Sequence, residues 1–154
     1  MSSALQLDER GVIVPCPQCG QANRLSYERV DQAPRCAKCQ AALSSPAAPL
    51  EVQTDDEFTA LTARATLPVL VDFWAPWCGP CQMAAPEVAK VAARGARRWL
   101  VAKVNTDELP APAQRHRATS IPLFVLFHHG REVARQAGTL PASMLQQFVE
   151  QHLT

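Results

Sequence analysis

Two cysteines, Cys78 and Cys81, stand three positions apart where a predicted strand gives way to a predicted helix. The preceding run, residues 68–73, is short and rich in apolar β-forming side chains, which indicates a buried strand. A helix begins with unpaired N–H groups and the positive end of its dipole, and both stabilise a thiolate. Because the thiolate is the nucleophile of disulfide exchange, the spacing predicts a redox-active dithiol. We expect Cys78 at the exposed helix start and Cys81 one turn further in, on the same face.

A single carboxylate, Asp72, interrupts the apolar run before the dithiol. Burying a carboxylate is costly unless it is paired, and burial raises its pKa. Asp72 is therefore a candidate for the base that takes the proton of Cys81. Strand alternation leaves a second possibility, in which Asp72 points outward from an edge strand. Lys103 is a candidate partner for Asp72, with a solvated strand lysine as the alternative.

The other four cysteines form the pattern C-x2-C-x16-C-x2-C, with members Cys16, Cys19, Cys36 and Cys39. This spacing is typical of a tetrahedral four-cysteine zinc site, so we predict one Zn2+. The surrounding segment has few apolar residues and needs such a staple to fold. Two disulfides in a secreted protein are the alternative, but residues 1–10 lack the basic start and apolar run of a signal peptide.

Composition bounds the classes of partner. The chain has 154 residues, 47% of them hydrophobic, and a net charge of +1. Residues 1–49 hold five basic and four acidic residues, and residues 50–154 hold ten of each, so we expect no nucleic-acid partner. No apolar run approaches the length that spans a bilayer, so we expect no membrane partner. Three C-x-x-C pairs fit a reducing compartment, and we expect a cytoplasmic protein.

The chain divides into three segments. Residues 1–42 carry the predicted metal site, and residues 43–49 are small, uncharged and proline-bearing, which is typical of a linker. Residues 50–154 predict an α/β domain with a central mixed sheet and helices on both sides. Its expected strands are residues 50–53, 69–75, 99–105, 123–127 and 132–136, and its helices begin near Thr54, Cys78, Glu108 and Pro141. Thr54 and Glu57 form a capping box. The four histidines, His116, His128, His129 and His152, show no ligand spacing, and we expect them at the surface.

Residues 50–154 resemble thioredoxin. Trp77-Cys78-Gly79-Pro80-Cys81 is that family's active-site motif unaltered, and residues 71–75 are similar to its strand with a buried aspartate. Ile121-Pro122 matches the family's cis-proline, and Gly138 fits the glycine before its final helix. The resemblance implies a thioredoxin fold and a protein-disulfide reductase. Its catalytic residues would be Cys78, Cys81, Asp72, Lys103 and Pro122, and its substrate-binding residues Trp77, Gly79, Pro80, Ile121 and Gly138.

The resemblance also implies partners. These would be disulfide-containing proteins as substrates and an NADPH-dependent thioredoxin reductase that restores the dithiol, and we expect a monomer. Three residues near the proline depart from the family pattern. Arg117 replaces a usual glycine, which takes a left-handed backbone more readily than arginine does. Thr119 and Leu123 also differ, and all three bear on substrate choice.

Residues 1–42 resemble the amino-terminal zinc ribbon of the thioredoxin 2 subfamily, and the whole chain is identified as a member of that subfamily. Two other functions stay open. One is a disulfide isomerase or oxidase, against which the Gly79-Pro80 pair argues because the family comparison associates it with reductants. The other is a redox-sensing zinc module or holdase, in which the ribbon does the work and the dithiol is a switch.

Overall fold

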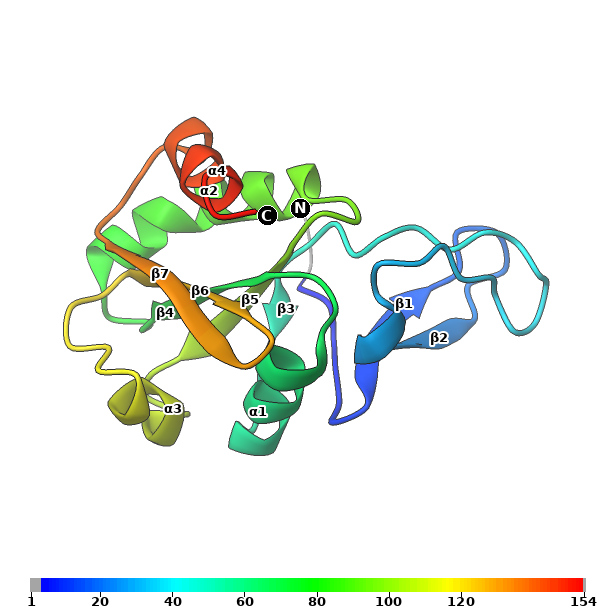
Figure 1. Ribbon diagram of the computed structural model, residues 1–154, viewed down its shortest axis with the longest axis horizontal. Coiled ribbons are helices and arrows are strands. Elements are labelled where there is room, and N and C mark those ends of the chain that lie inside the picture. Colours follow the sequence, from blue (N-terminus) through cyan, green and yellow to red (C-terminus); the bar gives the residue numbers. More distant parts are fainter. Residues whose placement is uncertain (1–3, 154) are drawn as a thin grey trace.

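The computed structural model describes residues 4–153 and contains a small two-stranded unit beside a larger α/β body (Figure 1). The small unit pairs β1 (Gly11–Pro15) antiparallel with β2 (Ala22–Ser26), and a short 3-10 helix, η1 (Tyr27–Arg29), follows. This small unit, residues 7–42, is called the ribbon below. Both of its C-x-x-C pairs lie in turns.

The larger body is built on a five-stranded mixed sheet. Its strands are β3 (Leu50–Glu51), β4 (Val69–Trp74), β5 (Leu100–Asn105), β6 (Leu123–His128) and β7 (Arg131–Ala137), in the order β3-β5-β4-β6-β7. The central strand β4 runs parallel to β5 and antiparallel to β6. Since β4 has neighbours on both sides, Asp72 does not point outward from an edge strand. The predicted central mixed sheet is confirmed.

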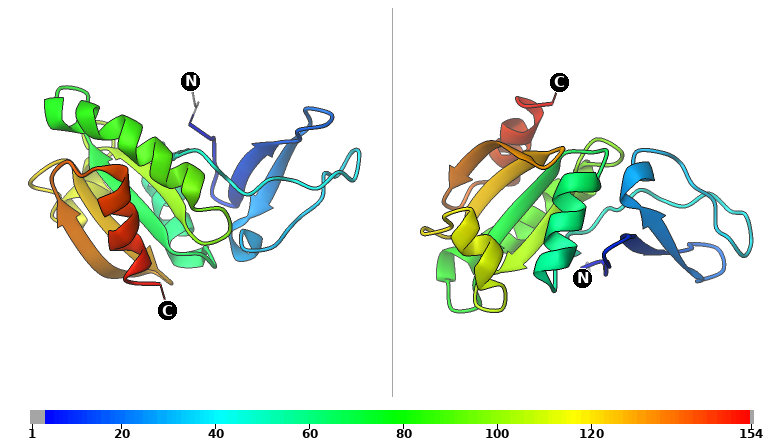
Figure 2. Two further views of the ribbon diagram at one scale, coloured as in Figure 1. Left: turned by 90° about the horizontal axis from the view of Figure 1, so that it is seen from above. Right: turned by 60° about the horizontal axis from the view of Figure 1, so that its bottom comes forward.

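Helices cover both faces of the sheet (Figures 1 and 2). One face carries α1 (Asp55–Arg64) and α3 (Pro110–Arg115), and the other carries α2 (Gly79–Arg94) and α4 (Ala142–Glu150). The predicted capping box begins α1: Thr54 Oγ1 accepts the Glu57 N–H at 3.1 Å, and the Glu57 carboxylate accepts the N–H of Gln53. Within residues 4–153, no helix is long and apolar enough to cross a membrane.

The ribbon and the larger body share buried side chains. One apolar cluster runs from Tyr27 and Val30 of the ribbon, through Leu43, to Phe58 of α1 and Val71 of β4. Leu43, in the segment that the sequence predicted as a linker, is only 2% exposed and belongs to this common cluster. The physical reason is that a ribbon with so few apolar residues buries them against its neighbour.

Polar contacts also join the two parts. The N–H of Thr66 donates to the carbonyl oxygen of Tyr27 at 3.1 Å, and Arg64 forms an ion pair with Glu28 at 2.8 Å. Upstream of the ribbon, Leu5 pairs in parallel with Leu50, so the first described residues lie along the edge of the large sheet. The amino-terminal residues therefore contact the larger body both before and after the metal-binding turns.

Candidate active site and metal site

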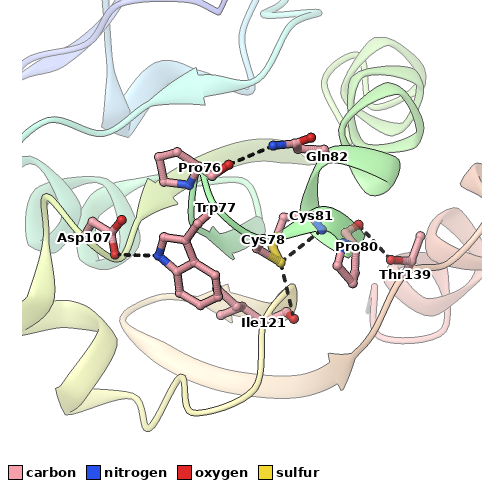
Figure 3. The surroundings of a disulfide bond; sticks show 9 residues. All are labelled: Pro76, Trp77, Cys78, Pro80, Cys81, Gln82, Asp107, Ile121 and Thr139. Atoms are coloured by element: carbon pink, nitrogen blue, oxygen red, sulfur yellow. Dashed lines mark hydrogen bonds between the residues drawn. A yellow bond between two sulfur atoms is a disulfide. The ribbon is translucent and has the colours of Figure 1, made fainter.

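The predicted dithiol lies at the start of α2, where Cys78 caps the helix and Cys81 follows one turn later (Figure 3). A disulfide joins the two residues, whose Cα atoms are 5.2 Å apart. Cys78 Sγ accepts the N–H of Cys81 at 3.2 Å, as expected for a sulfur at a helix amino terminus. The sequence predicted an exposed Cys78, but it is only 4% exposed. The reason is the loop at Ile121, whose carbonyl oxygen lies 3.7 Å from Cys78 Sγ.

An exposed indole stands next to the dithiol. Trp77 is 71% exposed, and its Nε1–H donates to Asp107 Oδ1 at 3.2 Å (Figure 3). On the other side of the turn, Thr139 Oγ1 donates to the carbonyl oxygen of Pro80 at 2.9 Å. Sequence reasoning missed Asp107 and Thr139, because both lie in loops far from the motif and no spacing links them to it. They hold the turn from two sides.

The proline loop packs against the disulfide. The peptide bond between Ile121 and Pro122 is cis, as predicted, and the side chain of Ile121 packs with Cys78 and Cys81. Gly138, the residue after β7, supports this loop, because its N–H donates to the carbonyl oxygen of Pro122 at 2.9 Å. Gly138 has φ +92°, a conformation that glycine adopts without strain. The structure thus brings Ile121, Pro122 and Gly138 to the dithiol.

Arg117 lies in the same loop with φ 55°, in the left-handed region. The sequence suggested that a glycine suits this position better. The arginine nonetheless adopts the conformation, which costs an L-residue free energy.

Asp72 lies on the α2 side of the sheet, because it shares a strand face with Leu70, which packs against α2. It is 1% exposed, and its Oδ1 has no hydrogen-bond partner among the described residues. Burial raises the pKa of this carboxyl to about 7, and the positive charge of Lys103 opposes part of that rise. A carboxyl with such a pKa accepts a proton near neutral pH.

Lys103 is the register partner of Asp72 on the adjacent parallel strand β5. The two side chains therefore lie on the same face of the sheet. Within residues 4–153 they form no ion pair within 4.0 Å, and Lys103 Nζ lies instead over the ring of Trp74, 4.7 Å from its centroid. Lys103 acts on Asp72 through space.

The second cysteine set gathers at one end of the ribbon. The Sγ atoms of Cys16, Cys19, Cys36 and Cys39 all lie within 4.8 Å of one another. The Sγ atoms of Cys16 and Cys39 are 3.5 Å apart, and those of Cys19 and Cys36 are 3.6 Å apart. Sulfurs around a tetrahedral zinc ion, with Zn–S near 2.3 Å, are separated by about 3.8 Å. The four thiols therefore fit a zinc ion.

Two turns of matching geometry supply these thiols. The Gly20 N–H donates to the Cys16 carbonyl oxygen, and the Gln40 N–H donates to that of Cys36. Backbone N–H groups also approach the sulfurs, from Gln18 to Cys16 and from Lys38 to Cys36, each at 3.4 Å. Such donors support thiolate ligands.

The histidines are less exposed than the sequence suggested. His116 is half-buried against Phe58, Phe73 and Phe127, with its ring centroid 4.9 Å from that of Phe127. Burial lowers the pKa of His116, and the nearby Arg115 adds to the effect. His128 and His152 are also partly buried, and only His129 is exposed.

Comparison with known proteins gives two family matches. Residues 49–151 match the family model described as Thioredoxin, and residues 15–41 match the one described as Thioredoxin 2, N-terminal. Thioredoxin C-3 of Corynebacterium nephridii is 38% identical over 142 residues, which cover 92% of this chain and 96% of that protein. Thioredoxin 1 of Nostoc sp. is 44% identical over 100 residues, covering 65% of this chain and 94% of that one.

A solved structure is similar as well. The N21Q mutant thioredoxin from Halobacterium salinarum NRC-1 has 35% identity and a TM-score of 0.64. The match covers 71% of this chain and 94% of that chain.

Proposed function

Because the chain belongs to the thioredoxin family and is a thiol-disulfide oxidoreductase, we propose that it reduces the disulfides of other proteins. The observation that carries the proposal is the Cys78–Cys81 disulfide at the start of α2, on the face of the sheet where the carboxyl of Asp72 is buried. A helix amino terminus favours a thiolate at Cys78. A carboxyl with a pKa of about 7 suits proton transfer near neutral pH.

The first step is attack by the Cys78 thiolate on one sulfur of a substrate disulfide. A mixed disulfide forms, the substrate S–S bond breaks, and the second substrate sulfur leaves as a thiolate that takes up a proton. In the second step Asp72 accepts the proton of Cys81, and the resulting thiolate attacks Cys78 Sγ. The mixed disulfide breaks, and the substrate sulfur that Cys78 first attacked leaves as a thiolate, which takes up a proton as Asp72 gives one up. The Cys78–Cys81 disulfide remains. Two electrons have passed to the substrate.

Lys103 would assist by its charge, which favours the ionised form of Asp72. We propose that substrates dock on the surface around the turn, on Trp77, Gly79, Pro80, Ile121 and Gly138. Trp77, Gly79 and Pro80 are exposed there, which supports the assignment. Pro122, next to Ile121, would keep that residue's backbone turned toward a substrate strand.

We further propose the cellular setting. A thioredoxin reductase that draws on NADPH would return two electrons to the Cys78–Cys81 disulfide. The protein would act as a cytoplasmic monomer without a nucleic-acid or membrane partner.

We propose that residues 1–42 form a zinc ribbon, residues 43–49 a connector and residues 50–154 the thioredoxin domain. Cys16, Cys19, Cys36 and Cys39 would hold one Zn2+, with four thiolate ligands that leave no open coordination position. The convergence of the four sulfurs supports this proposal.

Reduction of insulin by the full-length chain tests the function. Cys78→Ser should abolish turnover, and Cys81→Ser should accumulate a mixed disulfide with the substrate, because the resolving thiol is gone. Exposed Met83, replaced by alanine, serves as the control that keeps the rate. Turnover that survives in Cys78→Ser would refute the proposal, and protection of unfolded proteins by that variant would favour the holdase function.

A further inference from the structure

Two hollows adjoin Lys103, and the first described residue of the chain lines both. The larger, about 550 Å3, lies between α2 and the amino-terminal segment and is lined by Ala4, Pro49, Gln82 and Lys103, among others. The smaller, about 240 Å3, is lined by Ala4, Glu51, Trp74, Lys103 and Glu108, among others. Lys103 and Ala4 are common to both hollows. Neither hollow is lined by Cys78, Cys81 or Trp77.

Lys103 stands between these hollows and Asp72. Asp72 and Lys103 are register partners across β4 and β5, and Glu51 and Lys103 are register partners across β3 and β5. Three ionisable side chains therefore follow one another on the same face of three adjacent strands. Asp72, at the inner end of this row, is 1% exposed, whereas Glu51, at the outer end, is exposed. Asp72 lines neither hollow, so its register partner Lys103, which lines both, is the ionisable group that connects it to them.

The amino-terminal segment is held beside this route by backbone hydrogen bonds. The Leu5 N–H donates to the carbonyl oxygen of Pro49 at 2.9 Å, and the Glu51 N–H donates to that of Leu5 at 3.0 Å. Leu5 thus adds to the sheet next to β3, and Figure 1 shows this segment running beside β3 before the ribbon. Two residues later, Leu7 pairs with Val12 of the ribbon. The same short stretch belongs to both parts of the molecule.

We propose that residues 4–5 are a positioning element of the reductase: they wall the hollows through which Asp72, behind Lys103, meets water. The inference rests on the proposed role of Asp72 as the base. With the wall in place, few water molecules reach the carboxyl, and its neutral form is favoured. Without the wall, water enters beside Lys103, and the ionised form of the Asp72 carboxyl is stabilised.

The charged groups around the route are few. Lys103 comes from β5, Glu51 from β3 and Glu108 from the loop after β5. From β6, the register partner of Asp72 is the uncharged Phe124. The α2 residues that line the larger hollow, Gln82, Ala85, Pro86 and Ala89, carry no ionisable group. Lys103 is the charge that acts on Asp72.

The test is titration of the Asp72 carboxyl in the oxidised full-length protein, by carboxyl NMR with Asp72→Asn to assign the signal. Leu5→Pro removes the N–H that binds Pro49 and should detach the segment. The pKa of Asp72 should then fall by about one unit, a tenfold shift in its proton affinity. Leu5→Ala keeps both backbone bonds and is the matched control, with an unchanged titration.

Ala4→Phe gives the opposite test. It leaves both Leu5 hydrogen bonds in place and fills the hollows, so the pKa of Asp72 should rise by roughly half a unit. If Leu5→Pro does not fold, as judged by circular dichroism, Ala4→Phe decides alone. An Asp72 titration that Ala4→Phe leaves unmoved, or that Leu5→Ala moves as far as Leu5→Pro does, would overturn the proposal.

The pH profile of insulin reduction separates this proposal from the role of Asp72 itself. If Asp72→Asn leaves the profile unchanged, Asp72 is not the base and the proposed mechanism fails. If Asp72→Asn alters the profile while Leu5→Pro and Ala4→Phe leave the carboxyl titration unmoved, only the proposed wall fails.

Discussion

At the residue scale, the proposed role of Asp72 as a base comes with a cost to stability. Its carboxyl has a pKa of about 7 in the folded protein, because burial penalises the charge, against 3.8 for the ordinary group. The unfolded chain therefore releases this proton more readily. The penalty is absent below about pH 4, grows as the pH rises, and levels off above about pH 7 at on the order of 4 kcal/mol.

Asp72→Asn should remove that penalty. The difference in free energy of unfolding between the variant and the parent should widen from about pH 4 to pH 7 in favour of the variant. Urea titrations of the oxidised proteins at several pH values measure it. Asp55→Asn is the control of opposite sign, because Arg115 lowers the pKa of the Asp55 carboxyl. A difference for Asp72→Asn that does not change with pH would contradict the assignment.

Arg117 offers a second prediction at this scale. Its backbone has φ 55°, which costs a side-chain-bearing residue about 1–2 kcal/mol, whereas glycine adopts it freely. Glycine also loses more entropy on folding, so Arg117→Gly should raise the free energy of unfolding by a net of roughly 0.5–1 kcal/mol. Gln114→Gly, within the helix α3, should instead lower it by about 1 kcal/mol. Thermal unfolding of both variants tests the contrast, and loss of stability in Arg117→Gly would contradict it.

At the element scale, α1 and α3 meet over a cluster of aromatic rings that His116 completes. His116 follows α3, its ring contacts Phe58, Phe73 and Phe127, and its carbonyl oxygen accepts from Arg135 of β7. The loop to Pro122 begins here. The ring is therefore placed where its charge affects both the packing of α3 and the start of the proline loop.

Protonation of His116 should weaken the packing of this aromatic cluster. Burial lowers the pKa of His116 below 6.5, with Arg115 and Arg135 adding and Glu132 and Asp55 opposing. The stability that the neutral ring contributes is present above about pH 6.5 and is lost as the pH falls below it, because the unfolded chain binds the proton more readily. Below about pH 6.5, the free energy of unfolding of His116→Phe should therefore fall less than that of the parent protein. His129→Phe, at an exposed histidine, is the control, and equal acid sensitivity of parent and His116→Phe would count against the idea.

The same elements show what a sequence can and cannot disclose. The start of α1, the dithiol and the cis-proline could be predicted, because each depends on a short run of neighbouring residues. These are the capping box for α1, the C-x-x-C spacing for the dithiol and the family's Ile121-Pro122 motif for the cis-proline. Asp107 and Thr139 could not, because each reaches the turn from a loop that folding alone brings near. The burial of His116 was missed for a related reason, since its aromatic neighbours come from α1, β4 and β6.

At the scale of the whole molecule, the ribbon and the larger body share one buried apolar cluster. Tyr27 is fully buried, and its carbonyl oxygen binds the N–H of Thr66, which follows α1. Upstream of the ribbon, Leu5 pairs with Leu50 of β3. Whatever holds the ribbon in shape therefore also supports the larger body.

Removal of zinc tests this coupling. Metal binding and folding of a small ribbon are one equilibrium, so a chelator should unfold the ribbon and uncover the side of α1 that it protects. Residues 50–154 should keep their helices and sheet but melt about 5 °C lower, the effect of roughly 1 kcal/mol in a domain of this size. Calorimetry with and without chelator measures the shift.

Arg64→Ala provides the comparison that keeps the metal. It removes the contacts to Glu28 and to the carbonyl oxygen of Glu9 but leaves every cysteine in place. The variant should bind about one zinc per chain and show a smaller drop in melting temperature, because an exposed ion pair contributes little. The ribbon packs mainly through Tyr27 and its apolar neighbours. Chelation should therefore lower the melting temperature more than Arg64→Ala does. An identical melting temperature for the larger body with and without zinc would show that the shared cluster carries no coupling between the two parts.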